Sequence, residues 1–446
     1  MKSLTGVSVA LVGFCAIGAP GPSKVDNVEI VQGADKVVRI TYDLENGPAY
    51  VLADIQTNVA GDVWASTGLM GLDFATGDAN RLVTAAKGEI RWKPWKGMPG
   101  YDGNVRVRFT VRPKCDPPDY LVLNLKADVK VPYWYCTDTN SIPGGLLANE
   151  EYRRTKMVLK RIHADGESFA MGSSLAELGR TASREATHVV SFTNDYYIGV
   201  FEVSQKQFET VYGTAAGAYF KVDGDMRPME QVGFAQIRGD ANRYFYPNEP
   251  KNGTFLGNLR ARTGLKVDLP GEAQWEFAAR AGQPSLFWGN GRVIAYNSTK
   301  KYFHEFDDAI NGRIYRTGGL TTGGTDGVLA PENVGKATNE WSTANGTAVC
   351  GSYEPNLFGL YDTVGNVNEF CNDYLQADIS HLTHGEINAN GGNYADGTAR
   401  ANGWITRGGA WQQGVSSCRA AARSYYVGGS GQTLNWIGFR IACPVE

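Results

Sequence analysis

Apolar and polar residues alternate along short stretches in the first part of the chain. The clearest stretch covers residues 104–112, where Val or Phe at every second position is interleaved with three arginines. A period of two places the apolar side chains on one face of a β-strand. Similar stretches, separated by turn segments rich in Pro, Gly and Asn, occur at 37–44, 50–56 and 120–125. Several short strands with turns between them predict an all-β, immunoglobulin-like sandwich over residues 25–125.

The pattern changes after residue 154, where helical periodicity is confined to two short stretches. Residues 204–213 combine a capping-box signal with apolar residues on one helical face and a final glycine, and residues 271–282 lie between a Pro-Gly start and a Gly stop. Residues 126–154 show no clear periodicity and are expected to be a connector. We therefore predict a domain over residues 155–446 that consists mostly of loops, tied down by disulfides or bound cations.

The first 19 residues have the pattern of a secretory signal peptide. A basic start at Lys2 is followed by an apolar or small stretch over 4–18 and then by a Pro-Gly break. A buried N-terminal strand is the alternative interpretation. The apolar stretch is too short to span a bilayer comfortably. We therefore expect a secreted or periplasmic protein from which residues 1–19 are removed, with no membrane insertion.

The composition narrows the class of protein further. The 446 residues include 55 Gly, 22 Tyr, 18 Phe and 10 Trp, which excludes a disordered chain and a helical bundle. A net charge of -3 gives no indication of a nucleic-acid partner.

Six cysteines remain once the signal peptide, which contains Cys15, has been removed. An even number of cysteines in an oxidising compartment favours disulfides, although the sequence leaves their pairing open. For Cys418 the expected partner is Cys371 or Cys443. These disulfides are expected to hold the loops of the second domain together.

Five blocks in the second part of the chain carry a resemblance to a known family. They read FAMGS at 169–173, FEVSQ at 201–205, LPGEAQWEFAARAG at 269–282, NLFGLYD at 356–362 and IGFR at 437–440. In this order the blocks resemble the formylglycine-generating enzyme family, also called sulfatase-modifying factors. The resemblance implies an α+β, C-type-lectin-like fold with little regular secondary structure over residues 155–446. It implies nothing about residues 1–154.

The segment from Asp362 to Glu369 is a candidate metal site. Two carboxylates seven positions apart, with Gly365 between them, can converge with backbone carbonyls into an oxygen cage that suits Ca²⁺. A hydrogen-bonded turn is the alternative interpretation. The resemblance implies structural calcium, bound by the side chains of Asp362 and Glu369 and the carbonyls of Gly365 and Val367. It also implies a second calcium site between residues 296 and 339.

The segment after Arg407 decides whether the family's chemistry is expected. The resemblance implies oxidation of a client sulfatase cysteine to formylglycine, using oxygen and a copper ion held by two cysteines, because thiolates suit Cu(I). Here only Cys418 is present, three positions beyond the place of the second family cysteine. Ala410 and Asn368 also replace a serine and a tryptophan of the family pattern. We therefore expect no copper chemistry, and a divergent formylglycine-generating oxidase with Cys418 as its catalytic candidate is the alternative.

Aromatic and arginine residues near the C-terminus suggest a binding groove. Rigid rings with hydrogen-bonding edges suit a peptide, protein or glycan ligand, and arginines add selectivity for anionic groups, although burial in the core is the alternative. The candidate groove residues are Trp404, Trp411, Arg419, Arg423, Tyr425, Tyr426 and Trp436. The function predicted from the sequence is therefore a calcium-stabilised, peptide- or glycan-binding module.

Overall fold

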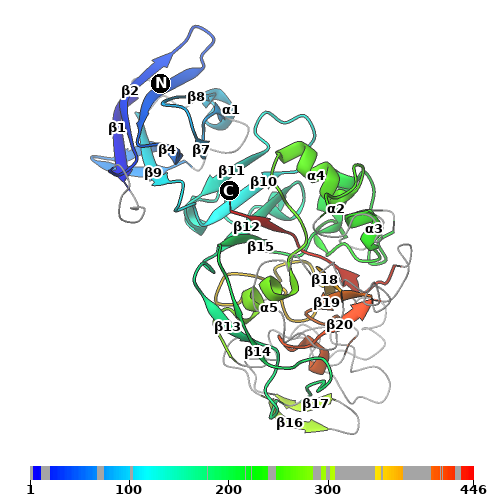
Figure 1. Cartoon of the computed structure of the whole chain (residues 1–446). Helices are drawn as coiled ribbons and strands as arrows, with labels where there is room; N and C mark the ends of the chain where they lie inside the picture. Colours follow the sequence, from blue (N-terminus) through cyan, green and yellow to red (C-terminus); the bar gives the residue numbers. More distant parts are fainter. Residues whose placement is uncertain are drawn as a thin grey trace. The chain divides into compact units, whose positions relative to one another are not determined.

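The computed structural model describes most of the chain in two compact units, Met1–Tyr152 and Arg153–Glu446 (Figure 1). The described residues are 4–11, 21–67, 75–100, 104–177, 179–215, 217–221, 224–239, 248–284, 293–297, 302–306, 347–352, 355–374, 403–411, 413, 415–426 and 433–445. Each unit is treated by itself below. Most of the predicted second calcium segment, 296–339, lies outside the described residues.

Two sheets form the body of the first unit. One has the order β1-β9-β4-β5, with β7 also paired to β4, and the other has the order β2-β3-β8-β6. The strands of the first sheet are β1 (Leu4–Leu11), β9 (Val105–Pro113), β4 (Ala49–Ala60), β5 (Val63–Ser66) and β7 (Arg81–Val83). Those of the second are β2 (Lys24–Gln32), β3 (Val38–Glu45), β8 (Lys87–Trp92) and β6 (Ala75–Gly77).

The alternation read from the sequence in β9 produces the core between these sheets. Val105, Val107, Phe109 and Val111 are all fully buried, and they share one hydrophobic cluster with residues of the second sheet such as Ile40. The residues between them face outward at least in part. The two sheets therefore share one apolar core, and the all-β, immunoglobulin-like sandwich stays a prediction.

The remaining elements of this unit are α1, which lies between β8 and β9, and the elements that follow β9 in the chain. Strands β10 and β11 pair antiparallel, from Tyr120↔Cys136 to Leu123↔Tyr133. The elements are α1 (Pro94–Gly97), β10 (Tyr120–Asn124), β11 (Tyr133–Cys136) and the short 3₁₀ helix η1 (Thr139–Ser141), and η2 (Glu150–Arg153) spans the boundary of the units.

Strand β1 lies inside the segment that the sequence identifies as a signal peptide. It pairs in parallel with β9, from Leu4↔Val105 to Leu11↔Val111. This arrangement corresponds to the alternative interpretation, a strand at the N-terminus, and the signal peptide itself stays a prediction. Among the described residues no helix is long and apolar enough to cross a bilayer.

The second unit consists of small sheets and short helices. Three strands, β12, β15 and β22, lie side by side, two hairpins are formed by β13 with β14 and β16 with β17, and a four-stranded sheet has the order β20-β19-β18-β21. The strands are β12 (Lys156–Ile162), β13 (Ser168–Met171), β14 (His188–Ser191), β15 (Tyr196–Gly199), β16 (Val293–Asn297), β17 (Tyr302–Phe306), β18 (Asn368–Tyr374), β19 (Trp404–Arg407), β20 (Ser424–Tyr426), β21 (Ile437–Gly438) and β22 (Ala442–Pro444). The helices are α2 (Gln205–Tyr212), η3 (Gly224–Met226), α3 (Phe234–Ile237), α4 (Phe255–Thr263), α5 (Glu272–Arg280) and η6 (Val415–Cys418).

Both helices expected from the sequence are present as α2 and α5. At the start of α2, Gln207 N–H donates to the Ser204 hydroxyl at 3.1 Å and Ser204 N–H donates to the Gln207 side chain at 2.9 Å, which is the predicted capping box. Gly213 ends the helix with a φ of 107°, a left-handed conformation that favours glycine. The described part of this unit is mostly sheet and loop with few helices, as expected of a C-type-lectin-like domain.

The cysteines of the second unit do not link its loops by disulfides, as the sequence had suggested they would. Cys136, Cys350, Cys371, Cys418 and Cys443 are all buried, reduced thiols, so the predicted pairing of Cys418 with Cys371 or Cys443 is wrong. The thiols instead fill separate places in the core. Cys371 packs with the ring of Trp275, for example, as a small hydrophobic side chain would.

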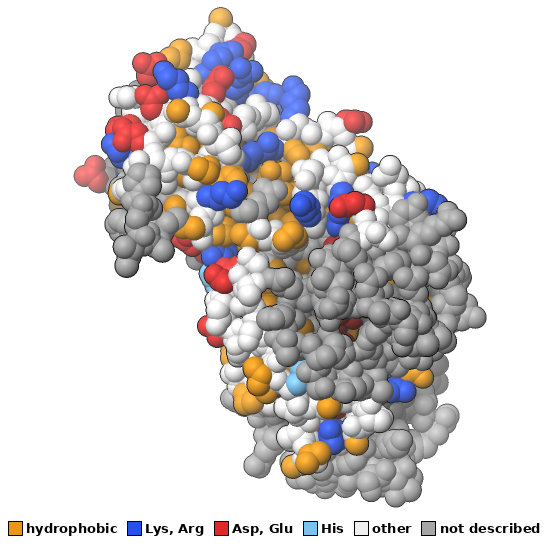
Figure 2. Space-filling view, in the orientation of Figure 1, with side chains coloured by type: hydrophobic (Ala, Val, Ile, Leu, Met, Phe, Trp, Pro, Cys, Tyr) orange, Lys and Arg blue, Asp and Glu red, His pale blue; other side chains and the backbone are white. Residues whose placement is uncertain are grey.

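On the face shown in Figure 2, basic and acidic side chains both lie among hydrophobic and neutral ones. No extended surface of a single charge is visible among the described residues on this face. This distribution agrees with the small net charge of -3 and gives no support to a nucleic-acid partner.

Candidate functional site

The candidate metal segment, residues 362–369, forms a tight turn that leads into β18. Asp362 and Asn366 have φ values of 60° and 64°, a left-handed conformation that Asp and Asn tolerate better than other side chains, and Gly365 has a φ of 85°. Gly365 N–H donates to the carbonyl of Gly408 at 2.8 Å, and Trp411 N–H donates to that of Asn366 at 2.9 Å. The turn is therefore bound to the segment in which the family's cysteines would lie.

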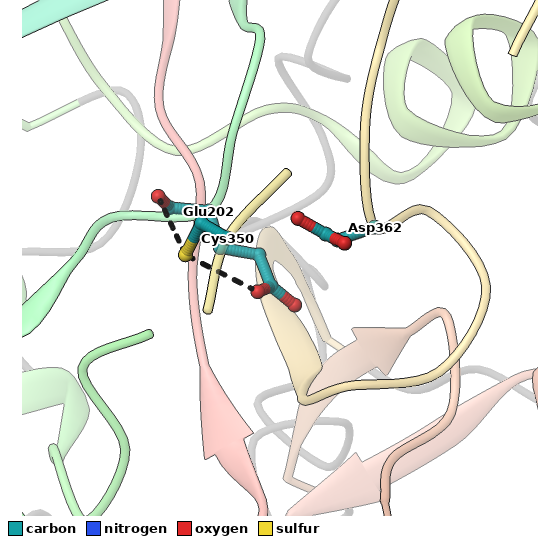
Figure 3. A group of neighbouring side chains, drawn as sticks. All are labelled: Glu202, Cys350 and Asp362. Carbon is teal, nitrogen blue, oxygen red and sulfur yellow. Dashed lines mark hydrogen bonds between the residues drawn. The ribbon is translucent and has the colours of Figure 1, made fainter. Parts of the chain in front are cut away.

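Three side chains from distant segments converge beside this turn (Figure 3). They are Glu202, which follows β15, Cys350, and Asp362, and one ligand atom from each lies within 4.8 Å of the others. All three side chains are buried. The Cys350 thiol donates to a Glu202 carboxylate oxygen at 3.8 Å, and Gly351 N–H donates to Asp362 at 2.7 Å. We refer to these three residues as the Glu202 cluster.

Glu369, the other predicted calcium ligand, is held by an arginine. Its two carboxylate oxygens accept hydrogen bonds from Arg440 at 2.5 and 2.6 Å, and one of them also accepts from the indole of Trp275 at 2.7 Å. Glu369 and Arg440 are both fully buried. Arg440 uses its remaining donors on the backbone carbonyls of Gly199 and Tyr361.

The predicted calcium ligands therefore fit a calcium ion only in part. The Asp362 carboxylate and the carbonyls of Gly365 and Val367 are hard oxygen donors of the right kind. Both oxygens of Glu369 accept hydrogen bonds from Arg440, whose positive charge already neutralises this carboxylate. Calcium at these four residues stays a prediction.

Negative charge is in excess around the Glu202 cluster. Burial raises the pKa of the Glu202 carboxyl well above its usual range, and the nearby charges of Asp362 and Glu369 raise it further. Burial likewise raises the pKa of the Cys350 thiol, with a further contribution from Glu202. The nearby charges of Arg440 and Arg153 oppose these shifts in part, and a bound cation would stabilise the anionic forms further.

The candidate catalytic residue Cys418 is sealed inside the domain. It ends η6 and is fully buried, and burial raises the pKa of its thiol to about 12. A Cβ atom at Gly409, where φ is 71°, would lie 2.4 Å from the sulfur, so only glycine fits beside it. Such a thiol is a poor nucleophile, because this role requires an accessible thiolate.

The two arginines of the predicted groove are buried and paired. Arg419 donates to both oxygens of Glu185 at 2.8 and 2.9 Å, and Arg423 donates to both oxygens of Glu272 at 2.6 and 2.9 Å. These pairs connect the segment around η6 with the loop before β14 and with α5. In this structure the arginines hold the fold together and do not face solvent.

The predicted aromatic residues divide into buried and partly exposed ones. Trp404 and Tyr426 are buried, and Trp404 stacks on Phe234 with ring centres 3.7 Å apart. Trp411, Tyr425 and Trp436 keep part of their surface exposed. The structure therefore leaves three of the predicted rings accessible to a ligand.

Two rings that the sequence did not single out lie next to Trp411. Phe220 meets Trp411 edge to face with ring centres 5.1 Å apart, and Tyr219 meets Phe220 in the same way at 4.9 Å. Tyr219 is 61% exposed. We call Tyr219, Phe220 and Trp411 the aromatic patch. No periodicity marks residues 219 and 220, and their proximity to Trp411 depends on long-range folding.

The buried carboxyl of Glu230 is hydrogen-bonded to the backbone of two residues of the aromatic patch. One of its oxygens accepts the backbone N–H groups of Tyr219 at 2.8 Å and Phe220 at 3.0 Å. The other oxygen is buried and has no hydrogen-bond partner among the described residues. Burial raises the pKa of this carboxyl from 4.5 to about 7, against the opposing effect of the two backbone N–H groups.

A comparison with known protein families gives a match that covers the second unit. Residues 148–445 match the profile of the sulfatase-modifying factor enzyme 1-like domain. The chain belongs to the sulfatase-modifying factor family. The family domain contains every site residue described above, so the sequence resemblance is confirmed.

Curated relatives of this sulfatase-modifying factor domain have different descriptions. The serine/threonine-protein kinase pkn1 of Chlamydia pneumoniae is 33% identical over 174 residues, 39% of this chain and 20% of the kinase. The pkn1 of Chlamydia caviae is 32% identical over 299 residues, 67% of this chain and 40% of the kinase. The chaperone protein LppX of Paenibacillus barcinonensis is 26% identical over 251 residues, 52% of this chain and 74% of that protein. The chain thus spans less than half the length of either kinase.

Solved structures also resemble the chain. PvdO from Pseudomonas aeruginosa shares 22% identity at a TM-score of 0.42, with 64% of this chain and 94% of that one covered. Variable protein 1 of Treponema denticola shares 20% identity at 0.42, with 65% and 96% covered.

Replacing Glu369 by Gln should destabilise the protein strongly. The substitution leaves Arg440 buried without a counter-charge, which costs about 3–5 kcal/mol of the free energy of unfolding. Chemical denaturation followed by circular dichroism measures this loss. The control is Glu209→Gln on α2, whose exposed pair with Lys206 contributes at most about 1 kcal/mol. Equal losses in the two variants would contradict the assigned role of Glu369.

Glu230 should make stability depend on pH. Its pKa is about 7 in the folded state against 4.5 for an unperturbed carboxyl, so the folded state binds more protons between these limits. The free energy of unfolding contributed by this group therefore falls as the pH rises from about 4.5 to about 7. Glu230→Gln should flatten this part of the profile, as measured by urea denaturation across the range. A profile unchanged from the wild type would refute the role of Glu230.

Cys418 should resist alkylation in the native protein. Because its thiol is buried and its pKa is raised to about 12, little thiolate is exposed to the reagent. Iodoacetamide labelling followed by mass spectrometry should be at least about tenfold slower at Cys418 in the native state than in urea. Equal rates in the two states would show a reactive cysteine.

Proposed function

We propose that the sulfatase-modifying factor domain of this protein binds a peptide or glycan ligand at the aromatic patch and does not oxidise cysteine with copper. The observation that carries the proposal is the partly exposed cluster of Tyr219, Phe220 and Trp411. Trp411 lies on the segment that follows Gly409, where the family resemblance places the catalytic cysteines.

The aromatic patch is rigid, as a binding surface should be. Trp411 is fixed by its backbone N–H, which donates to Asn366, and by its indole N–H, which donates to the carbonyl of Asn435 at 2.9 Å. The backbone of Tyr219 and Phe220 is fixed by Glu230. Rings that are already ordered lose little entropy on binding, and their faces suit both apolar side chains and sugar rings.

The segment after Gly409 supports binding more than oxidation. A bis-thiolate copper site needs two cysteines, and residues 410–417 contain none. The thiol that follows them, Cys418, is buried with a raised pKa. Ion pairs such as Glu369–Arg440 already hold the loops of the domain in place. A role in ligand binding therefore does not depend on a catalytic metal ion.

A polypeptide is the first ligand to test. The relative LppX, which matches over 251 residues, is described as a chaperone protein, and a chaperone binds polypeptides. The signal-peptide pattern of residues 1–19 supports a role outside the cytoplasm. A glycan remains the second ligand class within the same proposal.

Trp411→Ala should weaken ligand binding by at least about tenfold, or about 1.4 kcal/mol. Binding is measured on peptide and glycan arrays and then by calorimetry with the best ligand. The matched control is Trp95→Ala, which removes an indole that is 41% exposed in the first unit and should leave binding unchanged. Unchanged binding in Trp411→Ala, or equal losses in both variants, would exclude the aromatic patch as the site.

The alternative activity is tested separately. The protein is incubated with a Cys-x-Pro-x-Arg peptide, copper and a reductant, and aldehyde formation is followed by mass spectrometry. We expect no aldehyde above the protein-free control. Turnover that disappears in Cys418→Ser would establish a divergent formylglycine-generating oxidase and overturn the non-catalytic part of the proposal.

A further inference from the structure

The Glu202 cluster combines two kinds of metal ligand, carboxylate oxygen and thiol sulfur. Glu202 and Asp362 supply carboxylate oxygens, and Cys350 supplies sulfur, from positions up to 160 residues apart in the chain. Their exposed fractions are 1%, 7% and 0%. Figure 3 shows the three side chains gathered at one point, with Asp362 facing the other two.

We propose that Glu202, Cys350 and Asp362 hold a thiophilic divalent cation, for which Zn²⁺ is the first candidate. Zinc takes sulfur and carboxylate oxygen in a tetrahedral arrangement, with Zn–S about 2.3 Å and Zn–O about 2.0–2.2 Å. Ligand atoms around such an ion are about 3.3–3.8 Å apart. The present separations, all within 4.8 Å, need to close by about 1 Å. A water molecule or a nearby carbonyl completes the fourth position.

The charges of the three ligands also favour a bound divalent cation. Two carboxylates and a thiolate carry three negative charges, which a divalent cation reduces to one. Arg153, which donates to the carbonyl of Cys350 at 3.1 Å and favours the thiolate electrostatically, supplies one further positive charge. The cluster with its ion and Arg153 is therefore close to neutral, as a buried site must be.

Two buried hydroxyl groups close to the cluster in sequence have no hydrogen-bond partner among the described residues. Thr347 and Thr363, which flank the cluster in sequence three residues before Cys350 and one after Asp362, are 0% and 3% exposed. Their hydroxyl oxygens are buried and have no hydrogen-bond partner among the described residues. Buried hydroxyls are nearly always hydrogen-bonded, so each of these two lacks a partner that the described residues do not supply.

The sulfur ligand distinguishes this site from the calcium site that the family resemblance implies. Calcium takes oxygen ligands and does not select thiolate, whereas zinc does. The two sets share Asp362, so only one ion can be bound there at a time. Glu369 is already in an ion pair with Arg440, whereas the Glu202 carboxylate accepts hydrogen bonds from neutral groups, the side-chain amide of Asn366 and the backbone N–H of Val367.

Binding of the metal ion releases protons from its ligands. The Cys350 thiol loses its proton to solvent and its sulfur forms a bond to the ion, and any proton on Glu202 leaves by the same route. No electron is transferred and no other reactant is consumed. Affinity must therefore rise with pH.

The experiment uses the full-length protein after removal of metal with a chelator. Cd²⁺ is titrated in as a spectroscopic probe, and the thiolate-to-metal charge-transfer absorbance is recorded, followed by calorimetry with Zn²⁺. We expect saturation at one ion per chain and no displacement by a large excess of Ca²⁺. Absence of the charge-transfer band, or its removal by Ca²⁺, would overturn the proposal.

Two variants and one control locate the site. Cys350→Ser should abolish the charge-transfer band, and Asp362→Asn should retain it with at least about tenfold weaker binding. Cys371→Ser, which alters another fully buried cysteine outside the cluster, should bind as the wild type does. A band that survives Cys350→Ser would refute the site. If that variant does not fold, unchanged affinity in Asp362→Asn refutes it instead.

Discussion

The second unit depends on pairing buried arginines with buried carboxylates from other segments. Arg440, near the C-terminus, binds Glu369 of β18, and Arg423, before β20, binds Glu272 of α5. Charges in a dry interior are tolerated only when they are paired and hydrogen-bonded, so each pair fixes the relative position of two segments. In a domain of short strands and long loops, these contacts take the place that the sequence assigned to disulfides.

Sequence patterns predicted the local parts of this fold correctly. The alternation around Phe109 and the capping box at Ser204 depend on neighbours a few positions away, and the structure contains both. The five sequence blocks identified the family for the same reason, since each is a short contiguous signature. The Glu202 cluster could not be predicted, because Glu202 and Cys350 are 148 residues apart and meet only in the folded chain.

Residues predicted to bind a ligand were harder to place than residues of the core. Trp404 and Trp411 look alike in sequence, yet one stacks on Phe234 inside the domain and the other keeps an accessible edge. Arginines near the C-terminus could equally have been surface cations, and only the position of their carboxylate partners shows that Arg419 is internal. Whether a ring or a charge is exposed depends on its distant neighbours, which periodicity does not report.

The close contact between Gly409 and Cys418 has an evolutionary consequence. A Cβ atom at position 409 would meet the sulfur at 2.4 Å, so the glycine and the buried thiol constrain each other. If a mutation added a second cysteine upstream, Cys418 would still be buried in the interior. Recovery of a copper centre would therefore require a different conformation of the whole loop. The inner side of the segment is thus fixed by Gly409 and Cys418, while Trp411 on the same segment keeps part of its surface exposed.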